Sequence, residues 1–91
     1  MDSPVADNSA RSRFEMTVGD LVCIADYRLQ GDNLLITHVE TPPELRGGGC
    51  AARLMEGALA IARNRKMKVT PLCSYAAAYM RRHPEYSDLL A

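Results

Sequence analysis

The sequence predicts an α+β domain, close to α/β in character, with a mixed sheet and the element order β-β-β-α-β-α. Three segments of the first half alternate between polar and apolar residues and are joined by short turns, a pattern typical of an antiparallel meander. After Pro42 and Pro43 the apolar residues recur at helical spacing, which indicates that the chain leaves the sheet there. The chain has 91 residues, enough for one small domain.

The three strands of the meander are predicted over residues 13–18, 21–29 and 34–41, and turns that contain glycine separate them. The preceding residues 1–10 are polar and show no period, so we expect a disordered tail there. A single domain is expected over residues 11–91.

The second half alternates helices with one more strand. An amphipathic helix is predicted over residues 50–66, where a single apolar stripe recurs every three or four residues. A fourth strand follows over residues 67–72, and then an alanine-rich helix over residues 74–82 with Ser74 as its N-cap, ended by Pro84. Because strand–helix–strand connections are almost always right-handed, we expect the fourth strand beside the third and parallel to it.

Acidic and basic residues balance, with 11 of each, so the formal net charge is zero. A dedicated binder of nucleic acid or of an anionic membrane is usually basic, so we expect neither partner. No apolar run approaches the length of a membrane span and no signal-peptide pattern is present, which makes the cytoplasm the expected location. The three cysteines, Cys23, Cys50 and Cys73, are widely spaced, which favours reduced thiols over a disulfide framework and predicts no metal site.

A glycine-rich loop, Arg46-Gly47-Gly48-Gly49, connects the third predicted strand to the first helix. Glycines let a ligand approach the backbone, and the first N–H groups of a helix have no intrahelical partner. Together with the charge of Arg46, this geometry suits an anion such as phosphate or pyrophosphate. A flexible connection without a ligand is the alternative, because short glycine patterns are common.

The loop also carries a family signature. Arg46, Gly49 and Ala51 match the pattern R/Q-x-x-G-x-G/A, and the sequence resembles the GNAT superfamily of acyl-CoA-dependent N-acyltransferases over roughly residues 13–90. Three further stretches resemble, more narrowly, the minimal single-domain GNAT-like acetyl-CoA-binding proteins. In chain order these stretches are His38, Pro71-Leu72-Cys73-Ser74-Tyr75 and His83-Pro84-Glu85-Tyr86. The resemblance implies the minimal GNAT fold, in which two central parallel strands splay apart at the CoA site.

The resemblance implies that acetyl-CoA is the co-substrate. Backbone amides of the glycine loop and of the first helical turn, with Arg46, would hold the pyrophosphate. The backbone of the third strand would pair with the amides of the pantetheine arm. A proline at position 71 fits a strand whose neighbour has moved away, because proline has no N–H to donate. The cofactor-binding residues expected on this basis are Val39, Thr41, Arg46, Gly47, Gly48, Gly49, Cys50, Ala51, Ala52 and Ser74.

Two side chains of the third strand are candidate bases for the deprotonation of an amine. His38 and Glu40 lie two residues apart, so they share one face of the strand. Regular alternation puts Leu34 and Ile36 on that same face, which predicts a partly dry cleft around both candidates. The alternatives are a hydrogen-bonded structural histidine and a solvated carboxylate at the end of a strand.

Cys73 and Tyr79 complete the predicted catalytic set. A thiol at the start of a helix can be nucleophilic, so Cys73 could accept the acetyl group transiently, or it could be a small buried side chain. Many superfamily members place a tyrosine in the last helix as the proton donor. That position falls on Met80 here, and the neighbouring Tyr79 is the expected substitute, with core packing as its alternative.

The sequence therefore predicts a GNAT-like N-acetyltransferase that acetylates an unidentified amine, either a small molecule or a protein lysine, directly or through Cys73. The pattern favours a monomer. The alternative is a non-catalytic acyl-CoA-binding protein that serves as a sensor or an interaction module. GNAT enzymes normally use their first segments to recognise the acceptor. We predict no counterpart of those segments before the turn at Gly19, so both hypotheses stay open.

Overall fold

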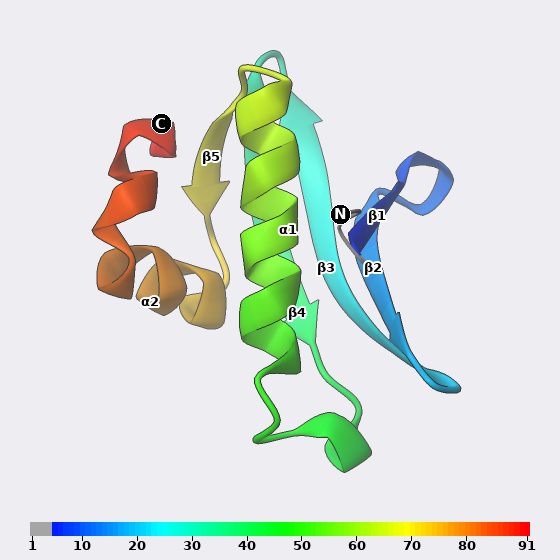
Figure 1. Ribbon diagram of the computed structural model, residues 1–91. Coiled ribbons are helices and arrows are strands. Elements are labelled where there is room, and N and C mark those ends of the chain that lie inside the picture. Colours follow the sequence, from blue (N-terminus) through cyan, green and yellow to red (C-terminus); the bar gives the residue numbers. More distant parts are fainter. Residues whose placement is uncertain (1–4) are drawn as a thin grey trace.

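The computed structural model describes residues 5–91. These described residues form five strands, two α-helices and three short 3-10 helices (Figure 1). In chain order they are β1 (Val5–Asn8), η1 (Ser9–Arg11), β2 (Arg13–Val18), β3 (Leu21–Gln30), β4 (Asn33–Glu40), η2 (Pro43–Leu45), α1 (Cys50–Asn64), β5 (Lys68–Pro71), α2 (Ser74–Arg82) and η3 (Pro84–Leu89).

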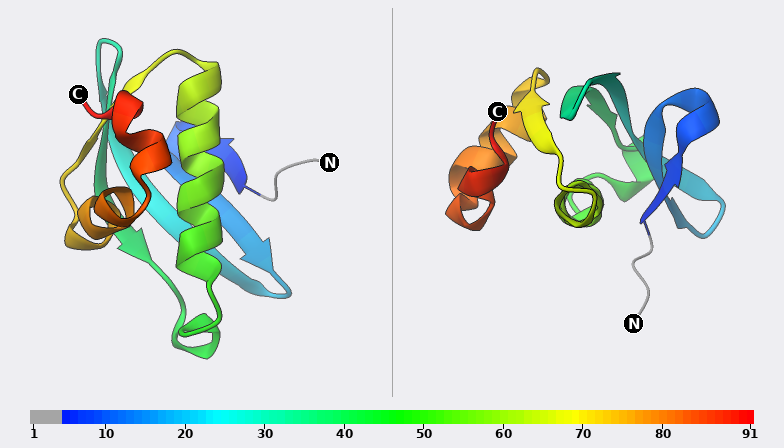
Figure 2. Two further views of the ribbon diagram at one scale, coloured as in Figure 1. Left: turned by 60° about the vertical axis from the view of Figure 1, so that its left-hand side comes forward. Right: turned by 90° about the horizontal axis from the view of Figure 1, so that it is seen from above.

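The strands form one sheet in the order β1-β2-β3-β4-β5. The pairs from β1 to β4 are antiparallel, and β4 and β5 are parallel, which confirms the predicted mixed sheet and the crossover through α1. α1 lies across one face of this curved sheet, and α2 and η3 lie beside β5 (Figures 1 and 2). No helix within residues 5–91 is long and apolar enough to cross a membrane.

The expectation of a disordered tail is wrong for Val5–Asn8, which form β1 and pair with β2. Residues 1–4 lie outside the described part of the chain. The hydrophobicity pattern of the sequence does not reveal β1, because long-range polar contacts hold this strand in place. Tyr27 donates a hydrogen bond of 2.5 Å to Oδ1 of Asp7, and Arg65 at the end of α1 lies 2.6 Å from Oδ2. The side chain of Asp7 is only 9% exposed, so this carboxylate links β1 to β3 and α1.

We expect Asp7→Ala to lower the free energy of unfolding by about 1–3 kcal/mol. The substitution leaves the buried Tyr27 hydroxyl without its acceptor and removes the partner of Arg65. Urea denaturation followed by circular dichroism measures the loss. Asp20→Ala, in the exposed β2–β3 turn, is the matched control and should cost less than about 0.5 kcal/mol. Equal losses for the two variants would show that Asp7 is not an anchor.

One helix end and one N-cap differ from the prediction. α1 ends at Asn64 and not at residue 66, because Lys66 adopts a left-handed conformation with φ 58° that cannot continue the helix. Ser74 is the first residue of α2, and Cys73 is the N-cap, so the predicted capping role of Ser74 is wrong. Neither difference moves the apolar stripe of α1, which is buried against the sheet through Leu54, Met55, Ala58, Leu59 and Ala62.

Candidate functional site

The parallel pair β4–β5 stops halfway along β4. The paired residues run from Asn33 with Lys68 to Ile36 with Pro71, and the amides of Leu72 and Cys73 then both donate to the carbonyl of Ile36, at 2.9 and 3.1 Å. Pro71, which has no N–H, is the last paired residue of β5. Among the described residues, β4 beyond Ile36 has no strand on this side, so its backbone edge is open to a ligand.

A β-bulge in β4 reverses the direction of the side chains that follow it. Asp26 of β3 pairs with His38 and the next residue, Tyr27, pairs with Ile36, so Thr37 is the extra residue. The alternation changes phase at that residue, and Val39 joins Ile36 on the side of α1 while His38 and Glu40 turn to the opposite side.

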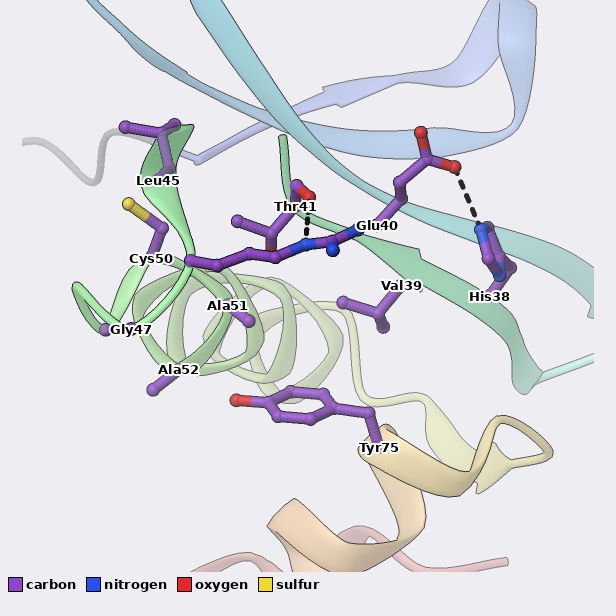
Figure 3. Close-up of a pocket in the computed structure, with 12 residues that line it drawn as sticks. His38, Val39, Glu40, Thr41, Leu45, Gly47, Cys50, Ala51, Ala52 and Tyr75 are labelled. Carbon is purple, nitrogen blue, oxygen red and sulfur yellow. Dashed lines mark hydrogen bonds and ion pairs between the residues drawn. The ribbon is translucent and has the colours of Figure 1, made fainter. Parts of the chain in front are cut away.

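The predicted partly dry cleft around His38 and Glu40 is therefore wrong. Their side chains are 56% and 64% exposed, and Nε2 of His38 lies 3.1 Å from Oε1 of Glu40. The bulge is the physical reason, because one inserted residue exchanges the two faces of a strand. Both side chains stay at the rim of the open edge of β4, where an acceptor that approached from solvent would meet them (Figure 3).

The glycine loop, residues 46–49, is exposed where it enters α1. Gly47 and Gly49 have φ angles of 83° and 81°, a left-handed conformation that glycine adopts without strain. Gly49 is the N-cap, and its carbonyl accepts the first helical bond from the amide of Arg53, at 3.1 Å. The N–H groups of the first turn therefore lack intrahelical acceptors and present the positive end of the helix dipole. Arg46 adds a positive charge beside them, and its Nε donates to the carbonyl of Thr41 at 3.2 Å.

The loop, the first turn of α1 and the open edge of β4 surround one cavity of about 590 Å³ (Figure 3). Tyr75, from the first turn of α2, reaches into it and points its hydroxyl toward the first turn of α1. The lining residues are His38, Val39, Glu40, Thr41, Leu45, Arg46, Gly47, Gly49, Cys50, Ala51, Ala52 and Tyr75.

Ten of the residues predicted from the sequence line this cavity, and four do not: Gly48, Cys73, Ser74 and Tyr79. Cys73 is partly buried and packs against the hydrophobic core, and Ser74 is exposed at the start of α2. Sequence reasoning did not assign Leu45 or Tyr75 to the site. The position of Tyr75 at the start of α2, one turn before Tyr79, is the sequence feature that could have placed it in the cavity.

The two tyrosines of α2 have different surroundings. Tyr79 is 8% exposed and stacks on the ring of His83 with 4.0 Å between the ring centroids. Burial, with a smaller contribution from Tyr86, raises the pKa of Tyr79 to about 12. Tyr75 is 38% exposed, and partial burial raises its pKa above the ordinary value of 10. At neutral pH both hydroxyls are protonated, but only that of Tyr75 reaches the cavity.

Comparisons with known proteins agree with this architecture. Residues 13–89 match the family model of GCN5-related N-acetyltransferases, and the chain belongs to that family. The fold is similar to the solution structure of a GCN5-like protein from Staphylococcus aureus, which is described as a candidate N-acetyltransferase. The two sequences are 21% identical, the TM-score is 0.75, and the alignment covers 100% of this chain and 91% of that one. No curated protein matches the chain significantly.

Proposed function

We propose that this protein binds acetyl-CoA in the cavity between β4 and α1 and transfers its acetyl group to a primary amine. One observation carries the proposal: the start of α1, whose first N–H groups have no intrahelical acceptor, and the unpaired edge of β4 line the same cavity. The first feature suits an anion, and the second suits an extended chain that carries amides. CoA has both, as a pyrophosphate and a pantetheine arm.

The amides of residues 47–52 are proposed to hold the pyrophosphate. The first N–H groups of α1 have no intrahelical acceptor and Arg46 lies beside them, so anionic oxygens can bind there in place of water. The amide of Gly48 already donates to the carbonyl of Leu45 at 3.3 Å and would have to give up that bond. The carbonyl of Thr41, which now accepts from Arg46, and the backbone of Val39 are the proposed partners of the pantetheine amides. This pairing would continue the parallel sheet where β5 stops.

Bound acetyl-CoA supplies an activated acyl group. The surrounding side chains accept one proton from the amine and donate another to the sulfur. The amine nitrogen attacks the thioester carbon and gives its proton to His38 or Glu40, which are exposed at the rim of the open edge. The carbon–sulfur bond breaks, and the sulfur takes a proton from the hydroxyl of Tyr75. The products are an N-acetylated amine and free CoA. The acceptor is proposed to be a small amine or a protein lysine.

Two alternatives have a specific observation in their favour. The route through an acetylated Cys73 is favoured by the position of this residue, because Cys73 is the last residue whose amide bonds to Ile36 before the strands separate. A non-catalytic acyl-CoA-binding protein is favoured by the position of Cys73 and Tyr79 outside the cavity. The direct route is the one for which the lining residues supply every group.

A titration with acetyl-CoA, followed by amide NMR shifts and intact mass, tests these proposals. The expected result is a set of shifts centred on residues 46–52, with smaller shifts at Val39 and Thr41 and no change in mass. A thiol reagent then measures CoA release with a lysine peptide, an aliphatic polyamine and an amino sugar. Absence of shifts would remove the proposal, and shifts without release from any amine would favour the non-catalytic protein.

Cys73→Ser separates the two routes of transfer. We expect unchanged acetyl-CoA affinity and a turnover rate within about twofold of the wild type, because the direct route does not use the thiol. A stable gain of one acetyl group on wild-type protein that is absent from Cys73→Ser, together with lost turnover, would establish the covalent route instead.

A further inference from the structure

The side chain of Arg46 extends along the wall of the cavity to the end of β4. Its Nε donates to the carbonyl of Thr41 at 3.2 Å, the bond drawn as a dashed line at Thr41 in Figure 3. Both residues line the cavity. The proposed function assigns the same carbonyl to an amide N–H of the pantetheine arm. The guanidinium and the ligand therefore need the same acceptor.

A tight turn brings Arg46 back to Thr41, five positions earlier in the chain. The amide of Leu45 donates to the carbonyl of Pro42 at 2.9 Å. The amide of Arg46 donates to the carbonyl of Pro43 at 3.3 Å, and its backbone continues in an extended conformation with φ −66° and ψ 140°. The two prolines fix two φ angles of this turn. Only the arginine side chain has to move for the contact with Thr41 to break.

The contact between Arg46 and Thr41 is weak enough to be exchanged for another. It is a single hydrogen bond from an exposed guanidinium to a neutral carbonyl. Within residues 5–91, no acidic side chain forms an ion pair with Arg46. A pyrophosphate is negatively charged and can accept from a guanidinium through two oxygens at once. It therefore attracts the Arg46 side chain more strongly than the carbonyl does.

We propose that Arg46 makes the cavity selective for thioesters that carry a pyrophosphate. In the free protein its guanidinium covers the carbonyl of Thr41 and hinders a pantetheine arm. A pyrophosphate at the first turn of α1 draws the guanidinium away, and the carbonyl becomes available to the arm. A thioester without a pyrophosphate has to displace the guanidinium and offers no charge to receive it. This inference rests on the proposed function, which places the arm at the edge of β4.

A movable Arg46 affects binding differently from a fixed positive charge. A fixed charge favours acetyl-CoA and leaves the affinity for S-acetylpantetheine, which is neutral, unchanged. A guanidinium that has to leave the carbonyl lowers the affinity for S-acetylpantetheine, in proportion to the fraction of molecules in which the carbonyl is covered. Because binding at two sites is thermodynamically linked, an anion that draws the guanidinium away must raise the affinity for the neutral arm.

Amide NMR titrations of the full chain with acetyl-CoA and with S-acetylpantetheine test the proposal. In Arg46→Ala, we expect the Kd for acetyl-CoA to rise at least about tenfold, because a charged hydrogen-bond donor is lost. The Kd for S-acetylpantetheine should fall at least about threefold, the effect of one hydrogen bond that no longer has to be broken. Arg28→Ala is the matched control, since it removes an exposed arginine of β3 outside the cavity. It should change either Kd less than about 1.5-fold.

Inorganic pyrophosphate provides a second measurement that needs no variant. In wild-type protein, saturating pyrophosphate should lower the Kd for S-acetylpantetheine about threefold. In Arg46→Ala the same addition should leave this Kd unchanged, because no guanidinium covers the carbonyl of Thr41.

The outcomes distinguish this inference from the proposed function. The inference is overturned if Arg46→Ala binds S-acetylpantetheine no more tightly than the wild type, or does not bind it at all. It is also overturned if pyrophosphate leaves the wild-type Kd for S-acetylpantetheine unchanged. In each of these cases, acetyl-CoA binding to the wild type would still support the proposed function, with Arg46 as a fixed charge. If acetyl-CoA does not bind the wild type, the proposed function fails, and the selectivity fails with it.

Discussion

Gly49→Glu should raise the Kd for acetyl-CoA at least about 100-fold, equivalent to about 2.7 kcal/mol, whereas Gly31→Glu should change it less than twofold. The carboxylate at position 49 lies where the proposed pyrophosphate contacts the first turn of α1. It competes for the same amides and repels the phosphates, so both attractive terms of the anion site are lost. Isothermal titration at low and moderate salt measures the difference.

The control matches the variant in charge and in backbone strain. Both glycines are exposed, both have positive φ (81° and 59°), and an added Cβ would meet nothing within 4 Å at either. Gly31 is in the β3–β4 turn, at the other end of α1 (Figure 1). A glutamate at the N-cap of α1 also faces the positive end of the helix dipole, so unfolding should not explain lost binding. Retained affinity in Gly49→Glu would remove the glycine loop from the CoA site.

The sequence predicted most of the sheet because each strand carries its own signal. Polar–apolar alternation defines β2, β3 and β4, and the change to helical spacing after Pro43 marks the crossover that makes β5 parallel to β4. β1 has four residues and one buried apolar side chain, Val5. Asp7 holds it in place through Tyr27 and Arg65, contacts that span 20 and 58 positions of the chain. Local patterns do not contain such contacts, and the strand was mistaken for a tail.

The sequence predicts the cavity lining where the backbone defines it, and it mispredicts the direction of the side chains after Thr37. The glycine loop needs only residue types, and Gly47 and Gly49 have the left-handed conformation that favours glycine. Successive side chains of β4 alternate between the two faces of the sheet, and the bulge at Thr37 inserts one residue into that alternation. The sequence around Thr37 contains no local signal for a bulge, because the bulge arises from the register between β3 and β4. His38 and Glu40 were consequently assigned to the wrong face.

The placement of the two tyrosines of α2 shows the same limit. Tyr75 and Tyr79 are one helical turn apart, so they point in similar directions. The superfamily pattern falls on Met80 and favours Tyr79 only because it is the adjacent residue. The outcome depends on where α2 begins relative to the end of β5. α2 starts three residues after Pro71, and this short connection brings the first turn of the helix, not the second, to the cavity. Tyr79 is left to pack against His83 and Tyr86.

This geometry leads to the second large effect: Tyr75→Phe should lower kcat about 100-fold and leave the KM for acetyl-CoA within about threefold. A general acid contributes about 10² to 10⁴ in rate, and a thiolate is a good leaving group, so the low end applies. The ring of phenylalanine keeps the packing in the cavity and removes only the proton donor. The amine that gives the fastest CoA release in the acceptor screen is the substrate for the measurement.

Tyr79→Phe is the matched control, because it removes the same atom from the neighbouring turn of the same helix. Its hydroxyl is buried outside the cavity, so we expect kcat to stay within about twofold of the wild type. The reverse result, with kcat lost in Tyr79→Phe and kept in Tyr75→Phe, would restore the assignment made from the superfamily pattern.

The pH profile distinguishes a proton donor from a residue that only shapes the cavity. Burial raises the pKa of Tyr75 above 10, so the hydroxyl keeps its proton across the neutral range and loses it only in strongly alkaline solution. A donor acts only while it is protonated, so wild-type kcat should fall as the pH rises past about 10. In Tyr75→Phe the residual kcat should lack this fall, because no proton is left to titrate at that position. A variant that keeps the alkaline fall would assign it to another group and leave Tyr75 as a wall of the cavity.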